Sequence, residues 1–166
     1  MPSHNKIIAV ELDASTGSNL PPELVDEQNR AIADLLVKND FRPVLDPAPA
    51  DNSASLGPYK INLKSRDQKL IIEINNNENN LTSVAISLKP FQRLMKDYAM
   101  VCDSYYKAVR QASPHKIEAL DMGRRGLHDE GATILQDNLE GKIECDFATA
   151  RRLFTLMYIL FVPSLR

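Results

Sequence analysis

The chain has 166 residues, 43% of them hydrophobic and 25% charged, and a formal net charge of −2. This length suits a single domain spanning residues 1–166, and the near-neutral charge argues against a nucleic-acid partner, because such proteins usually carry a basic excess. The apolar stretch 153–162 is about half the length that spans a bilayer, and the N-terminus lacks the apolar region of a signal peptide, so we expect a soluble cytoplasmic protein without a membrane partner.

The sequence offers no recognised cofactor or metal motif. Cys102 and Cys145 are the only cysteines. Their wide separation fits neither a redox pair nor half of a zinc site, and free thiols suit a reducing cytoplasm. No phosphate-binding loop, dinucleotide fingerprint or nucleophile elbow occurs. We therefore expect no metal and no cofactor.

The first part of the chain predicts a strand, a helix and a long loop. Residues 6–12 form a short β-branched run, followed by a polar turn over 13–19. Pro22 suits the first turn of a helix over 23–38, because its missing N–H is no loss there. The apolar positions of that helix are Val25, Ile32, Leu35 and Leu36. Four prolines then fall within 39–58, and this composition predicts a mobile, Pro-rich loop over 41–58.

Three further strands are indicated by alternating apolar and polar residues. They cover 59–64, 70–75 and 81–88, and short polar turns separate them. Connections this short require antiparallel pairing, since a parallel crossover needs a dozen or more residues. We expect a β-meander with one face exposed to water.

Helical periodicity replaces the strand pattern after Pro90. Apolar residues recur every three or four positions over 91–109, 114–139 and 147–161. Ser113 and Asp146 are expected to cap the second and third of these helices, and Gly141 to end the second. The last helix is apolar around most of its circumference, which predicts a central position and leaves a homo-oligomer open. The fold class is therefore α+β: an antiparallel β-meander of three to four strands packed beside a layer of about four helices.

Residues 122–131 conflict most with their surroundings. Three glycines, Gly123, Gly126 and Gly131, interrupt an otherwise helical pattern. If the helix is continuous they lower its stability by roughly 3 kcal/mol, since each is about 1 kcal/mol worse than alanine. One interpretation is a continuous helix, with arginines bridging to other helices and glycines allowing close packing. The other is a break at Gly123 or Gly126 that presents free N–H groups and positive charge to an anion.

This segment also contains the candidate site. His128 is the histidine best placed to act as an acid or base near neutral pH. Asp97 and Asp103 are possible partners for the arginines. The candidate ligand- or partner-binding residues are Asp121, Gly123, Arg124, Arg125, Gly126, His128 and Asp129.

Several short motifs between 90 and 156 share a resemblance to one family. They include Lys96-Asp97-Tyr98, the run 117–128, 139–144 and 149–154. Together they resemble a family of small bacterial proteins, chiefly alphaproteobacterial, that is known only as an uncharacterised protein family. The resemblance covers most of the chain and implies no activity, cofactor or catalytic residue.

Two hypotheses of function follow. The leading one is a non-enzymatic protein that binds a partner, most simply another protein, through the surface around 122–131. The rival is a small enzyme or sensor for an anionic metabolite, with Arg124 and Arg125 holding a phosphate or carboxylate and His128 acting as acid or base. The sequence does not decide whether the protein is an enzyme.

Overall fold

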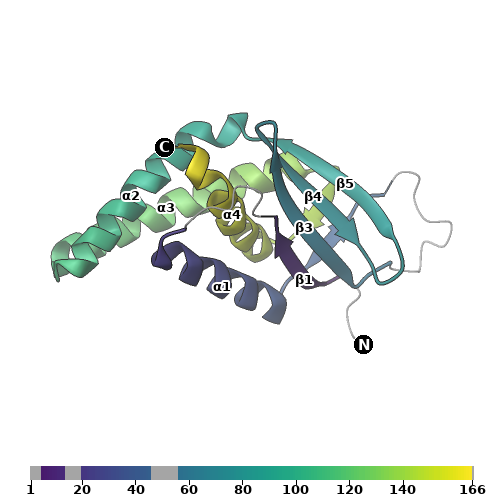
Figure 1. The fold of residues 1–166 in the computed structure, drawn as a ribbon, viewed down its shortest axis with the longest axis horizontal. Helices are drawn as coiled ribbons and strands as arrows, with labels where there is room; N and C mark the ends of the chain where they lie inside the picture. The colour runs from purple at the N-terminus through teal and green to yellow at the C-terminus, as the bar shows by residue number, and fades with distance from the viewer. Residues whose placement is uncertain (1–4, 14–19, 46–55, 166) are drawn as a thin grey trace.

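The computed structural model describes residues 5–13, 20–45 and 56–165 (Figure 1). Strands and helices alternate early in the chain, and helices dominate after residue 88. In chain order the elements are β1 Ile7–Leu12, α1 Pro22–Val37, β2 Phe41–Pro43, β3 Tyr59–Arg66, β4 Lys69–Asn75, β5 Asn80–Ser87, the 3₁₀ turn η1 Lys89–Phe91, α2 Gln92–Arg110, α3 Pro114–Leu139, β6 Ile143–Cys145, α4 Phe147–Phe161 and the 3₁₀ turn η2 Val162–Leu165. The predicted α+β class is confirmed.

The main sheet is the predicted meander with one added strand. Its order is β1-β3-β4-β5, and β3, β4 and β5 pair antiparallel through short turns. Buried residues face one another across the ladder, as in the pairs Ile61 with Ile74 and Leu63 with Ile72. The opposite face carries partly exposed polar side chains, among them the Lys64–Glu73 ion pair at 2.8 Å. One face therefore packs on the helices and the other meets water.

The fourth strand departs from the antiparallel expectation. β1 pairs parallel to β3, with Val10 opposite Ile61 and Leu12 opposite Leu63. The chain between these strands contains α1, and a connection of that length permits a parallel crossover. The sheet is therefore mixed.

The predicted loop over 41–58 contains a strand at its start, so the loop prediction was wrong there. Residues 41–43 form β2, which pairs antiparallel with β6 in a separate two-stranded sheet. Phe41 is fully buried, and Arg42 forms an ion pair with Glu144. The three-residue strand is too short for alternation to reveal it, and its partner lies about a hundred positions away. Residues 46–55 of the predicted loop lie outside the described residues.

α4 lies at the centre of the helical layer, as its apolar circumference predicts. Its buried residues include Leu153, Phe154 and Met157, and it contacts α1, α3 and β3. Figure 1 shows α4 between α1 and the long α2–α3 pair, which runs away from the sheet. The Asp146 side chain caps α4 by accepting a hydrogen bond from the Thr149 N–H at 3.0 Å, as expected.

Two other helix predictions need correction. The buried stripe of α1 consists of Leu24, Ala31 and Leu35, whereas Val25 is 40% exposed. The predicted apolar face was therefore wrong at the start of α1, where Leu24 is buried and Val25 is not. Ser113 precedes α3 without a side-chain capping bond, so Pro114 in the first turn is the operative start signal.

α3 is one continuous helix over 122–131, so the break is excluded. It ends before Gly141, whose φ of 79° suits glycine. Of the three interior glycines, only Gly131 is explained by packing within the described chain. A Cβ at Gly131 would lie 2.3 to 2.7 Å from three ring atoms of Phe154. At Gly123 the nearest such atom is Val101 Cγ1 at 3.9 Å, and at Gly126 nothing lies within 4 Å.

We therefore predict opposite effects of alanine at two glycines of one helix. Gly131→Ala should destabilise the fold by about 2 kcal/mol, because overpacking against the buried Phe154 ring outweighs the better helix propensity. Gly126→Ala, the matched control, should stabilise the fold by up to about 1 kcal/mol. Urea denaturation of both variants measures the two changes. Equal stabilisation by both would contradict the close packing at Gly131.

Candidate functional site

The seven predicted site residues divide between half-buried and exposed positions of α3. Asp121, Arg124 and His128 are half-buried and lie toward α1 and α4. Arg125 and Gly126 are exposed. The two remaining residues are also exposed: Gly123 lies beside α2, and Asp129 makes an ion pair with α4. Continuous helical geometry thus separates residues that a turn would have gathered.

Arg124 links three helices. Its guanidinium contacts Asp121 Oδ1 at 2.8 Å within α3 and Glu27 Oε1 at 3.4 Å in α1. The same group lies 4.2 Å from the centre of the Tyr105 ring in α2, a cation–π contact. We call these four residues the Arg124 cluster. Its charged side chains are only 20 to 22% exposed, so the cluster belongs mainly to the interior.

Glu27 is the member of this cluster that the sequence interpretation missed. The expected partners of the arginines, Asp97 and Asp103, make no ion pair with Arg124 or Arg125 in the described structure. Burial raises the pKa of the Glu27 carboxyl, and Arg124 opposes that rise. A sequence signal existed, because Glu27 falls on the same helical stripe as the buried residues of α1.

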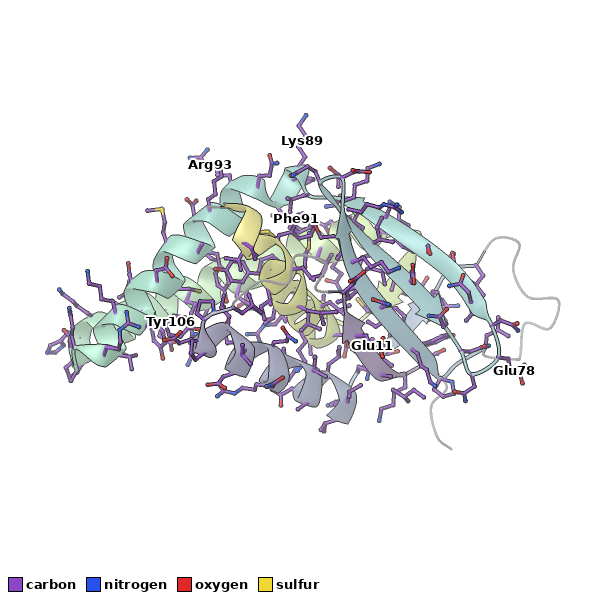
Figure 2. The ribbon with its side chains drawn as sticks, viewed as in Figure 1. Glu11, Glu78, Lys89, Phe91, Arg93 and Tyr106 are labelled. Atoms are coloured by element: carbon purple, nitrogen blue, oxygen red, sulfur yellow. The ribbon has the colours of Figure 1, made fainter. Side chains whose placement is uncertain are left out.

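Figure 2 shows Tyr106 on α2 beside the first turns of α1. Burial raises the pKa of its hydroxyl, and the nearby Glu27 charge adds to the rise. Tyr105 and Tyr106 are both half-buried.

His128 is held as a neutral ring. The Thr155 hydroxyl donates to the Arg151 carbonyl at 3.2 Å, so it accepts a hydrogen bond from His128 Nε2–H at 2.7 Å. The other ring nitrogen, Nδ1, is buried without a hydrogen-bond partner among the described residues. Burial, and next the Arg151 charge, lowers the pKa of His128 to about 4. At neutral pH the ring therefore donates one hydrogen bond and presents no accessible lone pair.

The remaining charged candidates form surface ion pairs. Arg125 is 73% exposed and contacts Asp121 Oδ2 at 2.9 Å, an i, i+4 pair within α3. Asp129 contacts Arg151 in α4 at 3.0 Å, rather than Arg125. Arg124 and Arg125 therefore point to different surroundings and do not form a joint clamp.

No group of three or more metal-ligating side chains comes together in the described ranges. A search of the described helices finds none that could cross a membrane. Both cysteines are free, and burial raises the pKa of each thiol to about 12. Neither thiol is activated as a nucleophile.

Comparison with known proteins gives relatives along nearly the whole chain. Residues 4–162 match the model of an uncharacterised protein family, UPF0262. A UPF0262 protein of Chelativorans sp. (strain BNC1) is 46% identical over 93% of this chain and 92% of its own. UPF0262 proteins of Rhodopseudomonas palustris (strain HaA2) and Rhizobium etli (strain CIAT 652) are each 44% identical, over 95% and 94% of this chain and 93% and 94% of theirs. No solved structure matches the chain.

We predict that Arg124→Met destabilises the fold by about 2 kcal/mol, because Glu27 is left half-buried without its cation. The loss should be larger at pH 8 than at pH 5. Removing Arg124 raises the folded-state pKa of Glu27 further, so stability falls as rising pH ionises it. Arg125→Met, which removes an exposed arginine, should change stability by less than about 0.5 kcal/mol. Equal losses in denaturant titrations would contradict a special role for Arg124.

His128 should make the fold sensitive to mild acid. Its folded-state pKa lies below the ordinary value of 6.5, so the unfolded chain takes up a proton that the folded chain refuses. Stability is therefore lost as pH falls from about 6.5 toward 4. Between pH 7 and pH 5, His128→Gln should lose about 1 to 2 kcal/mol less stability than the wild type. The matched control is His115→Gln, which removes an exposed histidine at the start of α3.

Proposed function

The chain belongs to the uncharacterised protein family UPF0262, and within that family we propose that it is a non-enzymatic protein that binds a partner protein through the outer face of α3. We use this name for the exposed surface of Met122, Gly123, Arg125 and Gly126. The proposed occupant is an amphipathic helix of another protein. The observation that carries the proposal is a pair of exposed glycines in a continuous helix.

The two glycines have no structural explanation within the described chain. Gly126 would accept a Cβ without meeting anything within 4 Å, and Gly123 would meet only Val101 at an ordinary distance. Neither has the positive φ that would require glycine. Each still lowers helix stability by about 1 kcal/mol relative to alanine. Local rules are broken in this way most often at functional positions, and glycine lets a second helix approach closely.

Neighbouring side chains suit a helix with an apolar stripe and an acidic edge. Met122 is 70% exposed, and methionine adapts to differently shaped apolar partners. Arg125 is 73% exposed and forms an ion pair with Asp121. Its guanidinium retains donors for a carboxylate on the partner.

The enzymatic alternative has less support. It requires Arg124 and Arg125 to hold one anion while His128 transfers a proton. Arg124 is instead paired with Glu27 and Asp121, and the free lone pair of His128 is buried. We therefore favour binding over catalysis.

We propose the cytoplasm as the location. Both cysteines are free thiols. Free thiols suit the reducing cytoplasm, whereas an oxidising compartment would favour their oxidation. This proposal is consistent with the choice of a protein partner.

Site-specific photo-crosslinking tests the outer face of α3. A photoreactive amino acid replaces Met122 in cells, and the same group replaces Val37, which is 78% exposed on α1, as the control. We expect one protein of distinct mass to be captured from position 122 only. Gly126→Leu should reduce that capture about tenfold, equivalent to about 1.4 kcal/mol, because the larger side chain holds the partner helix away.

Gly126→Leu should keep a cooperative unfolding transition, since open space surrounds Gly126. Capture from position 37 as well, or capture that survives Gly126→Leu, would contradict the proposal. A product with twice the mass of the chain would identify a second copy as the occupant and overturn the hetero-partner.

A further inference from the structure

A second feature, independent of the outer face of α3, is a pocket of about 200 Å³ between α1 and α4. We call it the arginine pocket. α1 contributes Arg30 and Asp34, α3 contributes His128, and α4 contributes Arg151, Arg152 and Thr155. Neither Arg124 nor Arg125 lines it, so it is not the clamp expected from the sequence.

The arginines of this pocket are incompletely neutralised. Two nearby carboxylates already have arginine partners. Asp129 pairs with Arg151. Glu27, which lines the pocket, pairs with Arg124. This leaves Asp34, an exposed residue, against Arg30 and Arg152. Within the described ranges neither of these two arginines has a carboxylate at ion-pair distance. The pocket therefore retains excess positive charge.

Arg152 provides the sharper observation. Its Nη1 donates to the Ala148 carbonyl at 3.2 Å, whereas its Nε is buried and has no acceptor in the described structure. A buried guanidinium N–H without an acceptor is unfavourable by about 1 to 3 kcal/mol or more, because it has lost its water. Such a group indicates an acceptor that the described residues do not supply.

The neutral state of His128 supports the same conclusion. After burial, the Arg151 charge contributes most to lowering the pKa of the ring, and Arg124 and Arg152 act in the same direction. Asp129 opposes them without restoring the ordinary pKa. Arg151 and Arg152, which line the pocket, therefore act on the ring in a direction that a bound anion would offset.

We infer that the arginine pocket binds a phosphate group, through the Arg30 and Arg152 guanidinium groups. These side chains come from different helices, and two guanidinium forks with separate origins suit an acceptor with several oxygens. The pocket volume accommodates inorganic phosphate or the phosphate end of a small metabolite. Asp34 at the exposed edge opposes more extended anions.

Calorimetric titration with inorganic phosphate tests the site, in chloride buffer at constant ionic strength and pH 7. The wild type should bind one phosphate saturably. Arg30→Gln and Arg152→Gln should each weaken binding at least about tenfold. Arg125→Gln, which removes the same charge from an exposed residue that does not line the pocket, should leave the affinity unchanged.

A second readout distinguishes lost binding from lost folding. Phosphate should raise the pKa of His128, followed by NMR of the ring, because the bound anion offsets the arginine charges. Arg152→Gln should raise that pKa without phosphate and abolish the further rise.

Two outcomes would overturn the inference. One is the absence of saturable phosphate binding in the folded wild type, and the other is equal weakening by Arg125→Gln and Arg152→Gln. A competition arm identifies the source of the phosphate group: displacement by glycerol phosphate supports a phosphorylated metabolite, and its failure to compete supports free phosphate. Tighter binding of succinate than of phosphate would contradict the phosphate assignment. None of these results depends on the partner proposed for the outer face of α3.

Discussion

The contact between the Phe154 ring and Gly131 sets the geometry of the helical layer. The ring fills the space that a Cβ would occupy in α3, so the two helices approach more closely than a larger residue would allow. Phe154 also contacts Phe91 at 6.4 Å and Tyr98 and His128 at 5.9 and 5.4 Å between ring centroids. One aromatic side chain therefore connects α4 with α2, α3 and the turn that follows the sheet.

Close packing at Gly131 determines how the polar residues of α3 are accommodated. Two turns earlier, the same side of the helix presents Arg124 to α1 and α2, where a buried cation must be paired. Glu27 and the Tyr105 ring provide that pairing. One turn earlier, His128 lies against Phe154 and is kept neutral by burial and by the arginines of α4. The packing of α3 against its neighbouring helices therefore accounts for Arg124 and His128, two of the residues that first suggested a site.

Local patterns predicted the elements better than their long-range arrangement. Alternation identified the three strands of the meander, and the Asp146 cap and Gly141 stop were read correctly because their causes lie within a few residues. The parallel pairing of β1 and the β2–β6 sheet depend on partners far along the chain, and β2 is too short to show a period. The helix phase of α1 was misjudged by including Val25 in its buried stripe.

The seven candidate residues share α3, but the structure gives them different surroundings. The continuous-helix interpretation included bridging arginines and close-packed glycines, but it could not reveal Glu27 as the neighbour of Arg124 or Phe154 as the neighbour of Gly131. The pocket arginines Arg30, Arg151 and Arg152 gather only when α1 and α4 pack together. Only the tertiary contacts show which arginines are held in ion pairs within the fold and which are free to bind a ligand. A single sequence does not display these contacts.

The central position of α4 also affects the order in which the fold can be completed during synthesis. The sheet and the helices α1, α2 and α3 all precede α4 in the chain, yet each helix or strand packed on α4 lacks its apolar partner until residues 147–161 have left the ribosome. Before that point the nascent chain exposes Tyr98 of α2, which packs on Phe154 and Tyr158, together with the faces of α1 and β3 that α4 covers. Exposed apolar surface of this kind favours aggregation and recruits chaperones. Premature termination before α4 should accordingly produce an insoluble chain rather than a smaller folded one.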